Sequence, residues 1–276
     1  MSYRVRVAKV ASLGQVPGPE VFWMGRFGEW LPLDIHVGLI EGGDRVVLVN
    51  SGPPLDLVDA MNAVWRDELG DAAHLAPTHP DGIVGVLAAW GISPQQVTDV
   101  VVTPLQAYAI GGVDRFPNAT VAMSRRGWVD LFAPPQFDPR RRMAVPDRLL
   151  RYLLEDAWFE RRVRLLEDED VVAPGIRTWW AGTHHRSSLA VEVDADGGLV
   201  TFSDVAFYYE NLERDWPLGI QESMAECRTA YRRIRASGAR FVSLYDPMTP
   251  TRYPGGLVAG GASRRAHEEG PNGIDR

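Results

Sequence analysis

The order of strand-like and helix-like segments is the feature that most limits the folds open to this chain. A β-rich stretch near the N-terminus is followed by helical segments, and a second β-rich stretch in the C-terminal half is again followed by a helix. Strict alternation of single strands with helices, which would predict a doubly wound parallel sheet, does not occur. The pattern therefore predicts an α/β protein made of two similar half-chains, each β and then α.

Apolar periodicity locates the individual elements. The turn Glu41-Gly42-Gly43-Asp44 separates two strand-like runs and predicts a hairpin. The clearest helix covers residues 219–237, where apolar residues recur every three or four positions and Gly238 is the expected end. Expected strands are residues 1–10, 33–40, 45–50, 97–102, 119–123, 176–180, 188–193, 199–203 and 240–244. Further helices are expected at residues 55–69, 83–90 and 149–158.

Charge and length narrow the possible partners and the domain organisation. The net charge of −7 arises from interspersed acidic and basic residues, without the basic stripe that binds a phosphate backbone. We therefore expect no nucleic acid partner. Residues 1–254 are predicted to form a single domain, and residues 255–276, rich in glycine and charge, are predicted to be a flexible tail.

The expected compartment is the cytoplasm. Cys227 is the only cysteine, which excludes an intrachain disulfide and fits a reducing environment. The N-terminus lacks the continuous apolar core of a signal peptide. No stretch approaches the roughly 20 apolar residues that a membrane helix needs, so no membrane partner is expected.

One segment carries the main functional signal. The run Thr103-Pro104-Leu105-Gln106-Ala107-Tyr108-Ala109-Ile110-Gly111-Gly112 directly follows an apolar run suited to a buried strand, so it lies on a strand-to-helix loop. Four other stretches of the chain add to this signal and serve with it as landmarks: residues 39–52, residues 98–103, Ser203-Asp204 and Tyr245-Asp246-Pro247.

On these landmarks the chain, from about Leu33 to about Tyr253, resembles the metallo-β-lactamase superfamily. Within it, the resemblance is to the lactonase-like branch that includes the acyl-homoserine lactonases. This implies a four-layer αβ/βα sandwich, in which two mixed sheets pack face to face, flanked by helices, with the active site at one edge. It also implies a dinuclear zinc centre held by an H-x-H-x-D-H motif.

The family's zinc ligands fall on residues that mostly cannot bind zinc. Of seven ligand positions, His184 and Asp204 keep the family residue. The other five are replaced by side chains that either lack a donor atom or donate poorly to zinc: Pro104, Gln106, Tyr108, Ala109 and Tyr245. The aspartate of the family's Asp-Thr-Gly turn is Asn50. A catalytic zinc commonly needs three protein ligands, so we expect no cofactor and assign no metal-binding residue.

The substituted site predicts a different chemistry. His184 and Asp204 are expected to face each other, and a histidine oriented by a carboxylate has the geometry of a general base. Tyr108 and Tyr245 would donate hydrogen bonds to a carbonyl oxygen. This set predicts a metal-independent hydrolase or lyase that opens a small lactone or ester. Substrate binding is assigned to Gln106, His185 and Tyr208.

Two other interpretations stay open. Asp204 and His184 form a relic pair in a non-catalytic protein that binds a small molecule or a partner, or the protein is a zinc-dependent hydrolase with unusual ligands. In each case the expected ligand is a small molecule, and a homodimer is possible because lactonase relatives often dimerise.

Several other residues are given structural interpretations. Thr78-His79-Pro80-Asp81 imitates a fragment of a metal motif but is predicted to cap the following helix. His36 lies in an expected strand and is predicted to be a packed core histidine. Ser187, Ser188 and Ser203 lack a Gly-x-Ser-x-Gly elbow, which argues against a serine nucleophile.

Overall fold

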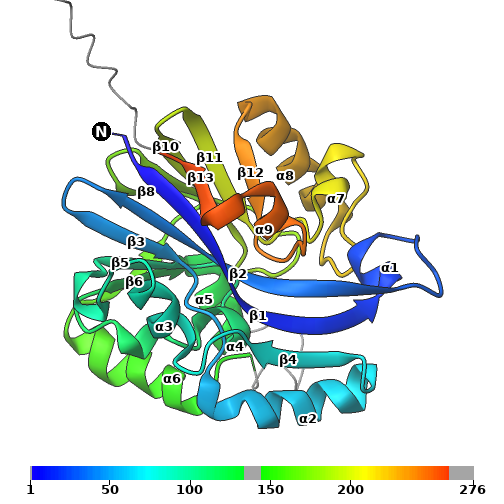
Figure 1. The fold of residues 1–276 in the computed structure, drawn as a ribbon, viewed down its shortest axis with the longest axis horizontal. Coiled ribbons are helices and arrows are strands. Elements are labelled where there is room, and N and C mark those ends of the chain that lie inside the picture. Colours follow the sequence, from blue (N-terminus) through cyan, green and yellow to red (C-terminus); the bar gives the residue numbers. More distant parts are fainter. Residues whose placement is uncertain (1, 134–143, 261–276) are drawn as a thin grey trace, which may run out of the picture.

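Two facing sheets with helices on their outer sides make up the architecture (Figure 1). The structure is a computed structural model that describes residues 2–133 and 144–260. Each sheet contains antiparallel and parallel neighbours, so both are mixed. The predicted αβ/βα sandwich is therefore confirmed.

The N-terminal sheet has eight strands within the described residues, in the order β13-β1-β2-β3-β5-β6-β7, with β4 also paired to β1. The first three strands of the chain are antiparallel, whereas β3, β5, β6 and β7 run parallel. The strands are β1 (Arg4–Pro17), β2 (Trp30–Gly42), β3 (Arg45–Val49), β4 (Ala73–Pro77), β5 (Asp99–Val102), β6 (Thr120–Ser124), β7 (Val163–Leu166) and β13 (Leu257–Ala259).

The C-terminal sheet has five strands among the described residues, in the order β12-β11-β10-β9-β8. Its neighbours are antiparallel except for β11 and β12, which are parallel. The strands are β8 (Glu169–Ala173), β9 (Ile176–Trp180), β10 (Leu189–Ala195), β11 (Gly198–Ser203) and β12 (Arg240–Ser243).

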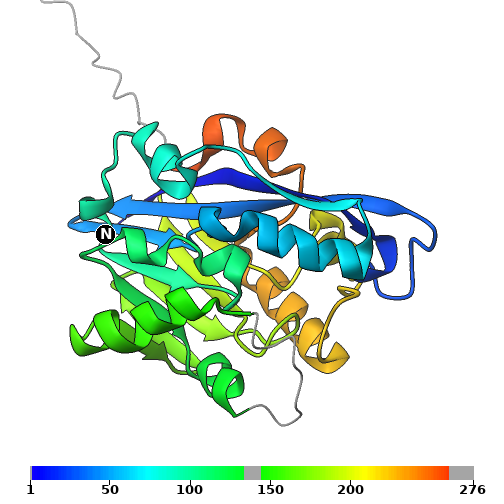
Figure 2. The ribbon, with the colours of Figure 1, turned by 90° about the horizontal axis from the view of Figure 1, so that it is seen from below.

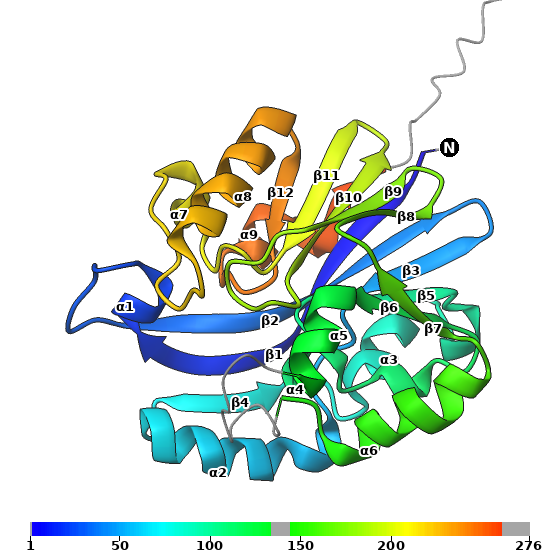
Figure 3. The ribbon, with the colours of Figure 1, turned by 180° about the vertical axis from the view of Figure 1, so that it is seen from behind.

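The helices cover the outer faces of the two sheets. Figure 3 shows α7 and α8 beside the C-terminal sheet and α2, α3 and α6 on the opposite side, and Figure 2 shows helices crossing the outer face of the N-terminal sheet. The helices are α1 (Gly18–Val21), α2 (Val58–Leu69), α3 (Gly82–Ala88), α4 (Ala107–Ile110), α5 (Arg125–Phe132), α6 (Asp147–Arg151), α7 (Tyr209–Glu213), α8 (Met224–Ser237) and α9 (Thr249–Arg252).

The hydrophobic core has two parts, one on each face of the N-terminal sheet. Val47 and Val49 of β3 face the C-terminal sheet and belong to the same buried cluster as Phe202 of β11. Leu48, between them, faces the helices and belongs to the same buried cluster as Leu87 of α3. Because both faces of β3 and β5 are covered, these strands are continuous apolar runs rather than alternating ones.

The start of α8 differs from the prediction. The sequence places it at Gly219, but the helix begins at Met224, where the Ser223 side chain accepts a hydrogen bond from the Glu226 amide. A Cβ at Gly219 would lie 1.7 Å from the Pro19 carbonyl oxygen, and the Ile220 amide donates to Glu20. Tertiary contacts therefore hold residues 219–222 in a non-helical form. At the other end, Gly238 ends the helix in the left-handed conformation, as predicted.

Two other local predictions need correction or qualification. Thr78 does not cap α3, because its hydroxyl donates to the Lys9 carbonyl and Asp81 is the residue at the helix start. β13 lies inside the predicted tail and pairs with β1 through Val5 and Ala259, so the chain is tied down there. Residues 261–276 of the predicted tail lie outside the described residues.

No helix within the described ranges is long and apolar enough to span a bilayer.

Strand ends from both sheets meet at one edge of the sandwich. Thr103, just after β5, accepts a hydrogen bond at its hydroxyl from the Leu189 amide at the start of β10. The His36 amide of β2 donates to the Leu244 carbonyl just after β12. The loops after β5, β9, β11 and β12 are thereby brought together at this edge. A site at one edge of the sandwich was expected from the sequence.

Candidate functional site

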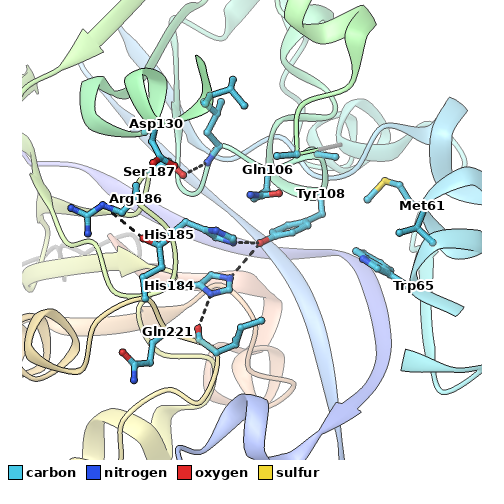
Figure 4. Close-up of a pocket in the computed structure, with 18 of the residues that line it drawn as sticks. Met61, Trp65, Gln106, Tyr108, Asp130, His184, His185, Arg186, Ser187 and Gln221 are labelled. Atoms are coloured by element: carbon cyan, nitrogen blue, oxygen red, sulfur yellow. Dashed lines mark hydrogen bonds and ion pairs between the residues drawn. The ribbon is translucent and has the colours of Figure 1, made fainter. Parts of the chain in front are cut away.

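A cavity of about 500 Å³ lies at this edge (Figure 4). Its size falls in the range of small-molecule binding sites, roughly 300–1,000 Å³. It is lined by residues from α2, the loop after β5, α5, the loop after β9 and the segment before α8: Met61, Val64, Trp65, Glu68, Leu105, Gln106, Ala107, Tyr108, Gly127, Asp130, Leu131, Ala144, His184, His185, Arg186, Ser187, Ile220, Gln221 and Glu222.

Tyr108, His184 and His185 form a cluster in the cavity wall. The Tyr108 hydroxyl oxygen lies 3.5 Å from Nε2 of His184 and 3.4 Å from Nε2 of His185 (Figure 4). The two imidazole rings pack with centroids 4.0 Å apart. A phenol has one proton, so Tyr108 donates to one of the two nitrogens at a time.

His184 is held in one tautomer. Its Nδ1 donates a hydrogen bond of 3.0 Å to the Ile220 carbonyl, which leaves Nε2 without a proton and facing Tyr108. Burial lowers the pKa of His184 to about 4, partly offset by the bond to Ile220. At neutral pH His184 is therefore an uncharged hydrogen-bond acceptor.

The loop that carries both histidines needs Gly182. Its φ is +56°, and a Cβ there would lie 2.5 Å from Oε2 of Glu226 and 2.8 Å from the Trp180 ring. The next residue, Thr183, accepts a hydrogen bond from the Glu222 amide at its carbonyl. This contact fixes the segment before α8 against the loop and brings the Ile220 carbonyl to His184.

Asp204 is completely buried and does not pair with His184. Its Oδ1 accepts a hydrogen bond of 2.6 Å from the Thr103 hydroxyl, and its Oδ2 accepts one of 2.5 Å from the Ser188 hydroxyl. Burial raises the pKa of Asp204 to about 6, and the two hydroxyl bonds lower it in part. No hydrogen bond between Asp204 and His184 occurs in the described part of the chain, so the predicted dyad is not formed.

Asn50 orients Thr103. Its Nδ2 donates to the Thr103 carbonyl at 2.7 Å, and its Oδ1 accepts from the Thr103 amide at 2.8 Å. The amide side chain donates and accepts at the same time, which an ionised aspartate cannot do. The replacement at position 50 thus positions the hydroxyl that binds Asp204.

Tyr245 lies away from the cavity. Its ring packs edge-on against Tyr108, with centroids 6.2 Å apart, and against Phe207, at 4.8 Å. Its hydroxyl is buried, and in the described residues no partner meets hydrogen-bond geometry, although the Tyr108 hydroxyl is its neighbour. Burial raises the pKa of Tyr245, and the adjacent Tyr108 hydroxyl and the charge of Asp204 raise it further. Tyr245 and Asp204 are absent from the residues that line the cavity.

The predicted substrate-binding residues separate into two groups. Gln106 and His185 line the cavity. Tyr208 does not line it, because its hydroxyl donates to the Pro32 carbonyl at 2.6 Å and its ring packs against Phe22. Phe207 instead packs edge-on against His184, with centroids 4.9 Å apart.

Three contributors to the site were missed from the sequence: Thr103, Ser188 and the Ile220 carbonyl. Thr103 and Ser188 bind Asp204. Because Ser188 does so and the Ser187 hydroxyl accepts a hydrogen bond from the Leu105 amide, neither serine is positioned as a nucleophile. Thr103 and Ser188 do adjoin the motif and the two histidines in sequence, which was the available signal. The sequence held no signal for the role of the Ile220 carbonyl, because it is a backbone group in a segment that was expected to be helical.

Solved structures match this chain by shape. An N-acyl homoserine lactone hydrolase, with N-hexanoyl-L-homoserine bound at its catalytic metal center, has a TM-score of 0.72 and 16% identity over 91% of this chain and 97% of its own. A probable metal-dependent hydrolase from Staphylococcus aureus has a TM-score of 0.69 and 13% identity over 89% and 90%. A dizinc quorum-quenching lactonase in complex with a product has a TM-score of 0.59 and 14% identity over 95% of each chain.

The resemblance to lactonases and other metallo-β-lactamase hydrolases is thus confirmed at the level of the fold. No protein-family model matches the sequence. No curated protein matches it either.

The expectation of no cofactor requires correction. One of the similar structures has a product bound at a catalytic metal centre and another is a dizinc lactonase, so zinc is the cofactor that these structures suggest. The residues at the site do not fit a dinuclear centre, since Pro104 and Ala109 offer no side-chain donor and both oxygens of Asp204 are bound by hydroxyls. Within residues 2–133 and 144–260 no group of three or more His, Cys, Asp or Glu side chains could hold a metal ion.

Proposed function

We propose that this protein is a lactonase-like hydrolase that opens a small lactone or ester in the 500 Å³ cavity. The groups that contact the substrate are Gln106, Tyr108, His184 and His185. The observation that carries the proposal is the Tyr108 hydroxyl, within 3.5 Å of two imidazole Nε2 atoms in the wall of a cavity of ligand size.

His184 has the role of proton acceptor. Its Nδ1 is committed to the Ile220 carbonyl, so Nε2 is the nitrogen that accepts a proton from an attacking water or an acidic carbon. A pKa near 4 keeps it in the basic form at neutral pH but makes it a weaker base than ordinary imidazole.

Tyr108 and Gln106 have the role of hydrogen-bond donors to the carbonyl oxygen. Burial and the charge of Asp204 raise the pKa of Tyr108, which keeps the phenol protonated at neutral pH. A donor that is already oriented in a partly dehydrated site stabilises developing negative charge more strongly than water does. The arrangement therefore suits a reaction in which a carbonyl oxygen gains charge.

The cavity walls differ in polarity. Met61, Val64 and Trp65 of α2 line one side, and the histidine cluster lines another (Figure 4). This favours a substrate with an apolar portion next to its carbonyl group. The solved N-acyl homoserine lactone hydrolase, which binds a hexanoyl product, supports the choice of an acylated lactone as the first compound to test.

The test incubates the protein with N-hexanoyl-homoserine lactone and, separately, with γ-butyrolactone. Ring opening is measured by the acid that it releases. We expect Tyr108→Phe and His184→Asn each to reduce kcat/KM about 100-fold or more, as is typical for the loss of a general base or of an oriented donor. Tyr152→Phe is the matched control, because Tyr152 bonds Arg162 outside the cavity. Unchanged rates in both site variants would refute the assignment.

A second candidate function is binding without catalysis. It is favoured by Asp204, whose carboxylate is buried and fully bonded to Thr103 and Ser188, so it has no direct role in the cavity. In that case calorimetry would detect lactone binding while the lactone is recovered intact after long incubation.

A third candidate is a zinc-dependent hydrolase with unusual ligands, which the metal centres of the similar structures favour. Elemental analysis of protein purified without chelator tests it directly. Stoichiometric zinc would support this candidate, and its absence would remove it.

A further inference from the structure

A second cavity, of about 370 Å³, lies between β1, β2, α3 and α9. It shares no lining residue with the first cavity. Most of its wall is apolar and is formed by Val7, Ala8, Val86, Ala89, Trp90 and Tyr253.

His36 lines this cavity and carries one unsatisfied polar atom. The residue is 1% exposed, and its Nδ1 donates to the Leu244 carbonyl at 3.2 Å. Nε2 is therefore the unprotonated acceptor, and it is buried without a hydrogen-bond partner in the described residues. Buried polar atoms are nearly always bonded, so an exception at a cavity points to a missing donor.

The charged side chains around this cavity are already paired. Nζ of Lys9 lies 2.7 Å from Oδ1 of Asp34. Arg6 bonds Glu41 and stacks on the Trp90 ring, 4.5 Å from its centroid. Neither cation is left to attract an anion, so the cavity suits an uncharged molecule.

His79 adds a donor to the same cavity. Its Nδ1 accepts a hydrogen bond of 3.0 Å from the Asp81 amide, so in the neutral ring the proton is on Nε2. The ring packs where a side chain at Gly85 would lie, since a Cβ there would be 1.9 Å from Nδ1 of His79. The cavity thus offers one acceptor and one donor in an apolar setting.

We propose that this cavity is a second binding site, for a neutral and mostly apolar molecule that carries a hydroxyl group. The hydroxyl donates to Nε2 of His36, and the apolar body packs against Trp90 and Val86. A phenol or an alcohol has this chemistry. A carboxylate does not, because it is charged, and an ether does not, because it has no O–H to donate.

The test is titration of isotopically labelled full-length protein with phenol and with anisole, its methyl ether. We expect amide shifts at Val7, Ala8 and Ala89, with phenol binding about five- to tenfold more tightly than anisole, as one net hydrogen bond predicts. Shifts confined to the first cavity, no binding of phenol, or equal binding of the two compounds would overturn the proposal.

Two variants locate the site. His36→Leu should abolish the preference for phenol over anisole, because it removes the acceptor. Ala89→Trp, at the exposed edge of the cavity, should block both compounds without touching His36, so it remains informative if His36→Leu does not fold. Unchanged phenol affinity in Ala89→Trp would contradict the assignment.

Discussion

Asp204→Asn tests the electrostatics of the site through protein stability. The carboxyl of Asp204 is completely buried, and burial raises its pKa from 3.8 to about 6. Between these two pH values the folded protein keeps a proton that the unfolded chain has released. The stability that this proton provides is complete below pH 4 and is lost as the pH rises through about 6.

The size of the effect follows from the two pKa values. The difference between 3.8 and about 6 corresponds to about 3 kcal/mol in the free energy of unfolding. Asp204→Asn cannot titrate, so the wild type should lose about 3 kcal/mol relative to the variant between pH 4 and pH 7. Contributions from the histidines are present in both proteins and cancel to a first approximation.

Urea unfolding of both proteins at a series of pH values between 4 and 7 measures this difference. A stability difference that does not vary with pH would show that the pKa of Asp204 is not raised. The opposite slope, with the wild type gaining relative stability as the pH rises, would refute the reasoning more strongly. It would mean that a bound cation or a charged histidine lowers the pKa of Asp204.

Three further predictions concern stability. Burial lowers the pKa of His184 from 6.5 to about 4, so between these pH values the unfolded chain binds a proton that the folded protein does not. The free energy of unfolding should therefore rise with pH over this interval. In urea unfolding, His184→Gln should reduce this rise by about 3 kcal/mol. Tyr245→Phe removes a buried hydroxyl for which no partner in the described residues meets hydrogen-bond geometry, so thermal melting should show unchanged stability or a gain of up to about 1 kcal/mol. A clear loss would show that this hydroxyl bonds the neighbouring Tyr108 hydroxyl. Gly182→Ala should cost about 1–3 kcal/mol by urea unfolding, since its Cβ would meet Glu226 and Trp180 at positive φ; a neutral effect would mean that the histidine loop is easily rearranged.

The sandwich could be predicted because its landmarks are long and consistent. The apolar run through β3 and the glycine turn before it indicate a buried strand in a hairpin, and Gly43 does take a positive φ. Local errors arose where tertiary contacts override local preference. The Ile220 amide and carbonyl bond Glu20 and His184 instead of continuing α8.

Of the residues assigned to the site from the sequence, Gln106, Tyr108, His184 and His185 line the cavity, and Asp204, Tyr208 and Tyr245 do not. Tyr108 and His184 were expected together and do lie together in the cavity wall. The partners of Asp204 could not be read from the sequence, because Thr103 is 101 positions away and a hydroxyl bonds almost any nearby acceptor. The predicted pairing of Asp204 with His184 was wrong for this reason. The two hydroxyls, and not His184, donate hydrogen bonds to the carboxylate.

The nitrogen resonances of the His184 ring test the central claim most directly, because they report the proton and the neighbours of Nε2. At pH 7 we expect Nδ1 protonated and Nε2 unprotonated, with the Nε2 resonance shifting both in Tyr108→Phe and on addition of N-hexanoyl-homoserine lactone. A protonated Nε2, or an Nε2 resonance that responds to neither change, would contradict the proposed Tyr108–His184 site.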